Sequence, residues 1–304
     1  MNTALTIGNF DGVHRGHAQL VKGLSEWRKS LEENSPSRCL ALTFEPHPRN
    51  ILCPDMPVSR LCDPNEKSQR LKQLGVDDVI IWKFDRDYSE TSASEFFSQL
   101  QSQFNPSLIT VGFNFHFGKN REGKPEKLLE WGREKGIDVQ IVRPIEGDGE
   151  LISSSRIRQL LEEGNIATAN RLLGRDYSLS NRVVQGDRRG HLLGFPTANL
   201  EIPRVHGSSQ CTPKPGVYIT STTLENGEVH PSVTNIGVKP TVSSEGKRLI
   251  ESHILNFSGD LYGKWLTVEF RDRLRDERRF GSIDELKEQI QEDSQIARKR
   301  LGLI

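Results

Sequence analysis

The sequence is short of cysteine, of excess charge of either sign and of long apolar runs, and each shortage excludes a class of protein. Its four cysteines form no C-x-x-C pair and no evident disulfide framework, which fits a reduced, cytoplasmic protein best. Lysine plus arginine equals aspartate plus glutamate at 41 each, so no bulk field favours nucleic acid or a membrane surface as a partner. No apolar run approaches the ~20 residues that span a bilayer, and the first residues do not have the basic segment and apolar core expected of a secretory signal.

The first half of the sequence alternates apolar runs with helical patterns, which predicts a doubly wound α/β domain with a parallel sheet. The expected strands are Ala4–Ile7, Leu40–Phe44, Val79–Trp82, Leu108–Val111 and Val139–Val142. The expected helices are Ala18–Leu31, Asp63–Leu74, Ser92–Phe104 and Glu126–Lys135. Ligands of such domains bind beyond the carboxyl ends of the strands, so the loops that follow strands are the informative ones.

The second half changes to short β runs around Leu173–Arg175, and the 304 residues are enough for two domains. We therefore expect domains over 1–173 and 174–304, the second a small antiparallel barrel. Its expected strands are Arg182–Gln185, Val217–Leu224, Val229–Ile236, Ile250–Leu255 and Trp265–Phe270, with an Asn-Gly hairpin signal between the second and third. A capping box at Ser282 predicts a C-terminal helix that ends near Leu301.

The stretch Gly8–His17 is the most informative feature of the chain, and it reads Gly-Asn-Phe-Asp-Gly-Val-His-Arg-Gly-His. Its glycines permit close backbone approaches, and the helix start that follows favours an anion. His14 and His17 are three residues apart, so both imidazoles can donate hydrogen bonds to one phosphate. The alternatives are a plain surface turn and a zinc site, but no cysteine or carboxylate lies at ligand spacing. The stretch resembles the H-x-G-H signature of nucleotidyltransferases, which transfer a nucleoside monophosphate from a nucleoside triphosphate.

Two further loops follow expected strands. Thr43–Arg49 carries two prolines, which either give His47 and Arg49 a fixed direction or mark an ordinary connection. Gly112–Gly118 carries three phenylalanines, which form either a hydrophobic plug or walls against which a flat ring stacks, with Asn114 reading a polar edge.

A serine-rich segment opens another helix. Ser154 and Ser155 are typical helix caps, while Arg158, one turn further on the same face, has the charge and geometry to hold a triphosphate tail.

These segments, in this order, resemble the bacterial bifunctional riboflavin kinase/FMN adenylyltransferase family, also called FAD synthetase. The resemblance implies that the first domain binds ATP and transfers its AMP part to FMN, with His14 and His17 as catalytic residues. It implies ATP contacts from Gly8, Phe10, Asp11, His14, His17, Ser154, Ser155 and Arg158. It places Asn114 and Phe115 in the flavin-nucleotide site. Ser155 stands where the family more usually has threonine, and the hydroxyl is kept.

The second domain carries signatures that resemble the riboflavin kinase module of the same family. They are Gly194–Asn199, Lys214–Tyr218, Asn235–Gly237 and Glu251–His253. The resemblance implies that Thr197 and Asn199 hold Mg²⁺ and the ATP phosphates, which suits their oxygen ligands. It makes Glu251 the base for the terminal hydroxyl of riboflavin. Taken singly, Thr197 and Asn199 would indicate only a turn after proline, and Glu251 would indicate a solvated charge at a strand edge.

The arginine-rich run Arg271–Phe280 is interleaved with acids and is mostly typical of a solvated face. Within it, Leu274–Glu277 resembles the flavin-side loop of the family. The resemblance therefore assigns Arg275 and Glu277 to flavin binding.

The sequence thus predicts two successive reactions, riboflavin to FMN and FMN to FAD, with ATP and Mg²⁺ and no nucleic-acid or membrane partner. The oligomeric state stays open. A different nucleotidyltransferase would share the first motif but would not need Glu251 or the Gly194–Asn199 element. A non-catalytic flavin-binding protein would not need His14, His17 or Glu251, all of which are present.

Overall fold

The structure, a computed structural model, describes residues 1–147, 149–186, 195–239 and 247–303. The chain divides by its internal contacts into two compact units, Met1–Ser154 and Ser155–Ile304, which we describe separately. This division counts the two helices that follow Ser153 with the second unit, whereas the domain boundary predicted at 173/174 keeps them with the first. That boundary stays a prediction. Among the described helices, none has the length and apolar character to cross a membrane.

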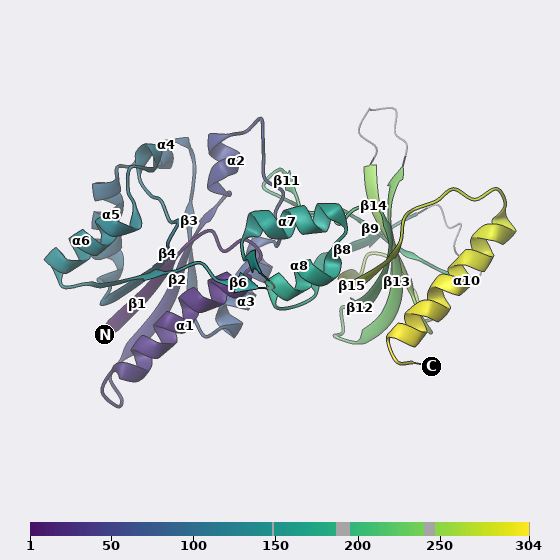
Figure 1. The fold of residues 1–304 in the computed structure, drawn as a ribbon, viewed down its shortest axis with the longest axis horizontal. Coiled ribbons are helices and arrows are strands. Elements are labelled where there is room, and N and C mark those ends of the chain that lie inside the picture. The colour runs from purple at the N-terminus through teal and green to yellow at the C-terminus, as the bar shows by residue number, and fades with distance from the viewer. Residues whose placement is uncertain (148, 187–194, 240–246, 304) are drawn as a thin grey trace. The chain divides into compact units, whose positions relative to one another are not determined.

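The first unit is built on a five-stranded parallel sheet in the order β3-β2-β1-β4-β5 (Figure 1). The strands are β1 (Asn2–Ile7), β2 (Ser37–Glu45), β3 (Asp78–Lys83), β4 (Leu108–Gly112) and β5 (Asp138–Val142). The helices are α1 (Arg15–Ser30), α2 (Pro48–Leu52), α3 (Pro64–Gln73), α4 (Arg86–Ser89), α5 (Ala93–Phe104) and α6 (Pro125–Lys135), with a 3-10 turn η1 (Lys119–Arg121). A small ribbon of β6 (Glu146–Gly147) and β7 (Glu150–Leu151) follows.

Helices cover both faces of this sheet, because alternate strand residues feed two separate cores. Leu20, Leu24 and Leu71, from α1 and α3, pack on one face. Phe96 and Leu128, from α5 and α6, pack on the other. The predicted doubly wound α/β fold is confirmed. The strand order reverses between β1 and β4, so the loop after β1 opens at the point where such sheets bind ligands.

The boundary between the units falls at the first residue of α7 (Ser154–Glu163). The second unit contains the rest of α7, then α8 (Ile166–Leu173) and a closed barrel in the order β12-β13-β14-β9-β8-β15. Its strands, all paired antiparallel, are β8 (Tyr177–Val184), β9 (Ala198–Glu201), β12 (Gly216–Thr223), β13 (Val229–Lys239), β14 (Lys247–Ile254) and β15 (Trp265–Arg275). A short ribbon joins β10 (Arg204–Val205) to β11 (Ser208–Ser209), and α10 (Ile283–Arg300) ends the described fold. The predicted antiparallel barrel and C-terminal helix are confirmed.

The barrel interior contains a closed ring of five hydroxyl groups. Hydrogen bonds of 2.7–3.0 Å join Thr220 to Ser232 and Thr234, Thr222 to Ser232 and Ser252, and Thr234 to Ser252. All five side chains have no exposed surface. In a ring of this kind each hydroxyl donates once and accepts once, so a polar core is fully satisfied and its bonds reinforce one another.

Breaking this ring should destabilise the barrel. Thr222→Val keeps the shape of the side chain but leaves Ser232 and Ser252 each short of one partner, and we expect a loss of about 1–3 kcal/mol in unfolding free energy. Hydrogen exchange of the amides of β12–β14 in the full chain measures it. Thr223→Val, at the half-buried next position of β12, is the matched control and should be near neutral. An equal effect of both substitutions would contradict a special role for the ring.

Candidate functional site

The loop between β1 and α1 holds three residues in the left-handed backbone region: Phe10 (φ 48°), Gly12 (φ 83°) and Val13 (φ 42°). This conformation costs a bulky or β-branched side chain on the order of 1–3 kcal/mol. Burial keeps the loop in place, because Phe10 has no exposed surface and lies edge-on to the ring of His17 at 5.3 Å. Its ring also fills the space over Gly8, where an added Cβ would meet it at 3.4 Å.

The two histidines of the loop lie together. Their rings stack with centroids 3.6 Å apart and planes 17° apart. The backbone N–H of His14 donates to Nδ1 of His17 over 3.2 Å. Because Nδ1 accepts this bond, the proton of the neutral His17 ring is on Nε2, which makes Nε2 a hydrogen-bond donor. His14 is buried and His17 half-buried, and the loop thus presents an ordered donor at the start of α1.

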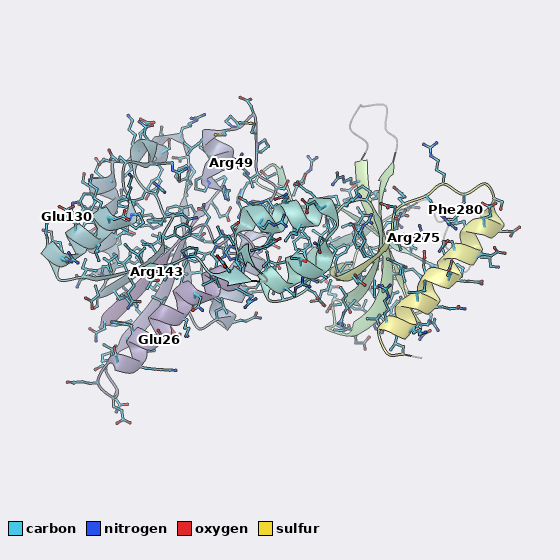
Figure 2. The ribbon with its side chains drawn as sticks, viewed as in Figure 1. Glu26, Arg49, Glu130, Arg143, Arg275 and Phe280 are labelled. Carbon is cyan, nitrogen blue, oxygen red and sulfur yellow. The ribbon has the colours of Figure 1, made fainter. Side chains whose placement is uncertain are left out.

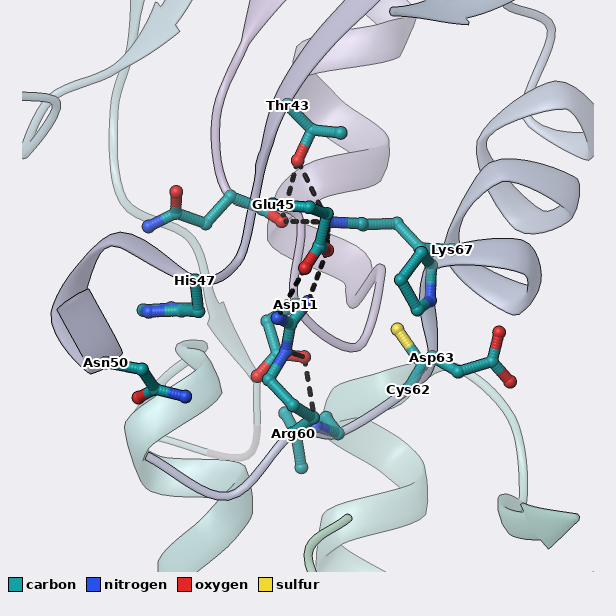
Figure 3. Close-up of polar contacts among 12 residues, drawn as sticks. Asp11, Thr43, Glu45, His47, Asn50, Arg60, Cys62, Asp63 and Lys67 are labelled. Atoms are coloured by element: carbon teal, nitrogen blue, oxygen red, sulfur yellow. Dashed lines mark hydrogen bonds and ion pairs between the residues drawn. The ribbon is translucent and has the colours of Figure 1, made fainter. Parts of the chain in front are cut away.

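A buried cluster of charges contacts the same loop (Figure 3). Both oxygens of Glu45 accept from Arg60, over 2.7 and 2.8 Å, and one also accepts from Lys67 over 2.6 Å. Asp11 joins them, since its Oδ1 lies 3.5 Å from Arg60 Nε and accepts the backbone N–H of Leu61 over 2.9 Å. All four charged side chains are buried.

The cluster reaches the backbone of the loop through one carbonyl. The carbonyl oxygen of Asn9 accepts from Lys67 Nζ over 3.2 Å and from Thr43 Oγ1 over 3.1 Å. Further along the loop, the N–H of Gly12 donates to Cys62 Sγ over 3.2 Å. Burial raises the pKa of the Cys62 thiol to about 12, and the charge of Asp11 adds to the rise, so this thiol stays protonated.

Burial alone would raise the pKa of Glu45, but hydrogen bonds and charge from Arg60 and Lys67 outweigh it and lower the pKa to about 2.

Glu45→Gln leaves both cations buried without this carboxylate, so we expect the first unit to lose about 3–5 kcal/mol of unfolding free energy. Denaturation followed by tryptophan fluorescence measures the loss, because three of the four tryptophans lie in that unit. The same substitution at Glu26, exposed in a 3.5 Å pair with Lys22, is the control and should change stability by at most ~1 kcal/mol.

The shift also predicts a pH dependence. The folded state holds Glu45 ionised to lower pH than the unfolded state, so its contribution is complete above pH 4.5 and is lost as the pH falls toward 2. Glu45→Gln should remove this part of the acid sensitivity. An unchanged slope between pH 4.5 and 2 would contradict the assignment.

In the second unit, one carboxylate lies between two amides on neighbouring strands. Glu251 on β14 is directly opposite Asn199 on β9 and directly opposite Asn235 on β13. Their strand neighbours, such as Leu200 and Ser252, have no exposed surface and fill the barrel interior. Because side chains alternate along a strand, the row of three lies on the outer face. The predicted base and the predicted Thr-x-Asn element are therefore adjacent.

The segment before β9 is tied to the strand of Glu251. His253, on the same face of β14, contacts the carbonyl of Pro196 through Nδ1 over 2.9 Å and lies edge-on to Phe195 at 5.4 Å. A carbonyl only accepts, so Nδ1 is the donor. Burial lowers the pKa of His253, which favours the neutral ring that makes this contact. The carbonyl of Thr197 in turn accepts from the amide of Asn199 over 3.4 Å. The first residue of the predicted motif, Gly194, lies outside the described residues.

Known proteins match both units in the same order. The family model for FAD synthetase matches residues 1–156, and that for riboflavin kinase matches residues 173–301. The chain belongs to the bifunctional riboflavin kinase/FMN adenylyltransferase family. The member from Escherichia coli strain K12 is 40% identical over 300 residues, which cover 98% of this chain and 93% of the relative. The member from Bacillus subtilis strain 168 is 34% identical over 298 residues, with 97% and 91% covered.

A solved structure shares the fold of the family over nearly the whole chain. It is a Streptococcus pneumoniae protein described as a macrolide-efflux protein, with a TM-score of 0.85 at 29% identity, covering 98% of this chain and 94% of the other. The predicted family and fold class are confirmed.

The remaining predicted ATP residues of this family member lie around the loop and at the start of α7. Asp11 turns its carboxylate into the buried cluster, and its backbone carbonyl accepts from Ser154 Oγ over 2.8 Å. Ser155 and Arg158 lie one turn apart on α7. Their contacts with ATP stay predictions.

The loop after β4 divides its three phenylalanines between the two interpretations of the sequence. Phe117 is buried in the core, Phe115 stacks on it at 5.6 Å and is half-buried, and Phe113 is exposed. Asn114 is exposed, and its carbonyl lies 2.9 Å from His116 Nδ1. The core plug is therefore only part of this loop, and the flavin contacts of Asn114 and Phe115 stay predictions.

Two arginines have structural surroundings that the sequence did not reveal. Arg49 is exposed on α2, whose N-terminus is capped by His47, the acceptor of the Arg49 N–H over 3.2 Å (Figure 2). Arg275 binds both oxygens of the buried Asp293 of α10, over 2.7–3.1 Å, and lies 5.9 Å from the ring of Phe280 (Figure 2). Its guanidinium thus fastens α10 to the barrel, while its flavin role and that of Glu277 stay predictions.

Sequence reasoning missed the buried charges of Glu45, Arg60 and Lys67. One available signal is the position of Lys67, four residues before Leu71 on the buried side of α3. A cation on the apolar side of a helix needs a buried anion. The choice of Glu45 among the acids of the chain requires the fold.

Proposed function

We propose that this chain converts riboflavin to FAD in two ATP-dependent steps, one in each of the predicted domains 1–173 and 174–304. The observation that carries the proposal is the match to the FAD synthetase and riboflavin kinase family models in succession. It is joined by the 40% identity to the Escherichia coli bifunctional riboflavin kinase/FMN adenylyltransferase over nearly all of both chains. The substrates are riboflavin, FMN and ATP, and FAD is the final product.

In the kinase step, Glu251 takes the proton of the terminal riboflavin hydroxyl, whose oxygen then bonds to the γ-phosphorus of ATP as the bond to ADP breaks. An alcohol is a weak nucleophile until a base removes its proton. The place of Glu251 beside Asn199 in the strand register supports this role. Glu251 is half-buried, so its side chain is partly accessible from outside the barrel.

Thr197 and Asn199 are the residues that would hold Mg²⁺. The Oδ1 atom of Asn199 is buried and, within the described residues, has no hydrogen-bond partner, so it fits a hard cation that takes oxygen ligands. The bound ion would neutralise charge on the ATP phosphates. Thr197 and Asn199 would orient those phosphates toward the hydroxyl held at Glu251.

In the adenylyl step, an oxygen of the FMN phosphate attacks the α-phosphorus of a second ATP, and the bond to pyrophosphate breaks. The FMN phosphate is already ionised at neutral pH, so this step needs no general base. His14 and His17 would donate hydrogen bonds to the phosphate under attack, and Ser154, Ser155 and Arg158 would hold the triphosphate tail. The ordered Nε2–H donor of His17 supports the assignment.

Incubating the purified chain with riboflavin, ATP and Mg²⁺ and separating the flavins by chromatography tests the proposal. We expect FMN first and FAD afterwards, with supplied FMN converted directly to FAD. Absence of both products would contradict the proposal. FAD from supplied FMN but no FMN from riboflavin would leave only the nucleotidyltransferase alternative. We also propose that the protein is cytoplasmic. We further propose domains over residues 1–173 and 174–304, and separate expression of these two pieces would test the boundary.

A further inference from the structure

We infer that Asn235 is a specificity-determining residue of the kinase site, whose amide oxygen accepts a hydrogen bond from a hydroxyl of the ribityl chain of riboflavin. The inference rests on the proposed function of the second unit. It adds a residue that recognises the sugar-alcohol part of the acceptor rather than its flavin ring.

The position of Asn235 follows from the register of three strands. Asn199, Glu251 and Asn235 are directly opposite one another on β9, β14 and β13. Side chains directly opposite in an antiparallel pair have Cβ atoms roughly 4.5–5.5 Å apart and extend from the same face. Glu251 therefore has one amide on each side.

The two amides share a property that needs an explanation. Within the described part of the chain, the buried side-chain oxygens without a hydrogen-bond partner are Oδ1 of Asn199 and Oδ1 of Asn235. A buried acceptor without a donor costs about 1–3 kcal/mol. Two such oxygens on either side of one carboxylate indicate a binding site, in which the ligand provides the hydrogen-bond donor or cation that the protein lacks there.

The orientation of the Asn235 amide is supported by its neighbours. A Cβ added to Gly237 would lie 3.1 Å from Nδ2 of Asn235 and 2.8 Å from Oε1 of Glu277. The amide nitrogen and the carboxylate thus approach the same point. This orientation puts the amide N–H groups of Asn235, and not its oxygen, on the side of the Glu277 carboxylate, which is the electrostatically favourable choice. The unpartnered oxygen of Asn235 is then the atom left for a ligand.

The two sides of Glu251 take different ligands. Asn199 and Thr197 form the side proposed for ATP and Mg²⁺, and the attacking and leaving oxygens of phosphoryl transfer lie roughly in line. The acceptor alcohol therefore belongs on the Asn235 side. The terminal hydroxyl of the ribityl chain gives a proton to Glu251, and a neighbouring hydroxyl of the ribityl chain donates a hydrogen bond to Asn235. Two adjacent hydroxyl groups can make both contacts, whereas a flavin ring without the ribityl chain cannot.

The test compares two flavins in the full chain. Riboflavin carries the ribityl hydroxyls, and lumiflavin has a methyl group in their place. For Asn235→Ala and for the larger Asn235→Leu, we expect the KM for riboflavin to rise about three- to tenfold, the effect of one hydrogen bond. The KM for ATP and the inhibition constant of lumiflavin against riboflavin phosphorylation should not change. Adenylylation of supplied FMN reports on folding, and Asn226→Ala, in the exposed hairpin turn, is the matched control.

The outcomes separate this inference from the proposed function. If both variants bind riboflavin normally, or lose riboflavin and lumiflavin equally, Asn235 does not read the ribityl chain. If the KM for ATP rises instead, Asn235 belongs to the nucleotide side and the inference is wrong. If the unaltered chain forms no FMN from riboflavin, the proposed function itself fails.

Discussion

Glu251→Gln is expected to lower the rate of riboflavin phosphorylation by about 10²–10⁴-fold, the usual contribution of a positioned general base. Glutamine keeps the size of the side chain and a hydrogen bond to the hydroxyl, but it cannot take the proton. Adenylylation of supplied FMN should continue at its normal rate, because that reaction belongs to the other unit. Initial rates of the two half-reactions, each followed by chromatography, measure the effect within one preparation.

The design of this experiment uses the second reaction as an internal standard. A variant that misfolds as a whole loses both reactions, whereas a lost base affects one. Glu228→Gln, at an exposed carboxylate 3.5 Å from His230, is the matched control and should retain both rates. Riboflavin turnover near the normal rate in Glu251→Gln would show that the base lies elsewhere, and Asn199 would then need another explanation for its buried oxygen.

The fold of the first unit could be predicted because its signal is local. Each parallel strand contains a short, mainly apolar run, and each of the five expected runs lies within an observed strand. Short elements such as α2 and α4 were not predicted, since four or five residues carry too little periodicity. The same limit applies to β9, a strand of four residues whose sequence was recognised as a motif rather than as a strand.

The barrel was harder to predict because its interior is partly polar. Thr220, Thr222 and Ser232 have no exposed surface, yet their hydroxyls obscure the alternation of apolar and polar residues that identifies a half-buried strand. Their partners lie on neighbouring strands, and pairing across strands is invisible in one sequence. For the same reason, the contact of Arg275 with Asp293 appears only when α10 is in place. The flavin role of Arg275 came from the family resemblance and stays a prediction.

Candidate residues could be found in the sequence where they belong to a short motif. They were missed where their partners lie far away along the chain and are brought close only by the fold. His14, His17 and Glu251 belong to motifs whose order along the chain suffices to propose a role. Asn235 belongs to a motif too, but the role that we infer for it depends on its position opposite Glu251, which only the strand register shows.

His17→Ala is expected to lower adenylylation of FMN by about 10²–10³-fold, the usual loss when one donor to a developing charge is removed. The reason lies in the hydrogen bond from the His14 N–H to Nδ1 of His17, which holds the ring in the tautomer that donates from Nε2. Riboflavin phosphorylation should continue, so FMN should accumulate. His17→Gln keeps an N–H donor and should retain more activity than His17→Ala.

The control for this substitution is His230→Ala, which removes a histidine from the second unit, where its ring lies 5.3 Å from Phe257. It should leave FAD formation unchanged. Loss of both FMN and FAD in His17→Ala would mean that the two reactions are not independent. Full FAD formation would mean that the stacked pair of rings is only a cap for α1, because a capping residue contributes to stability but not to the rate of adenylyl transfer.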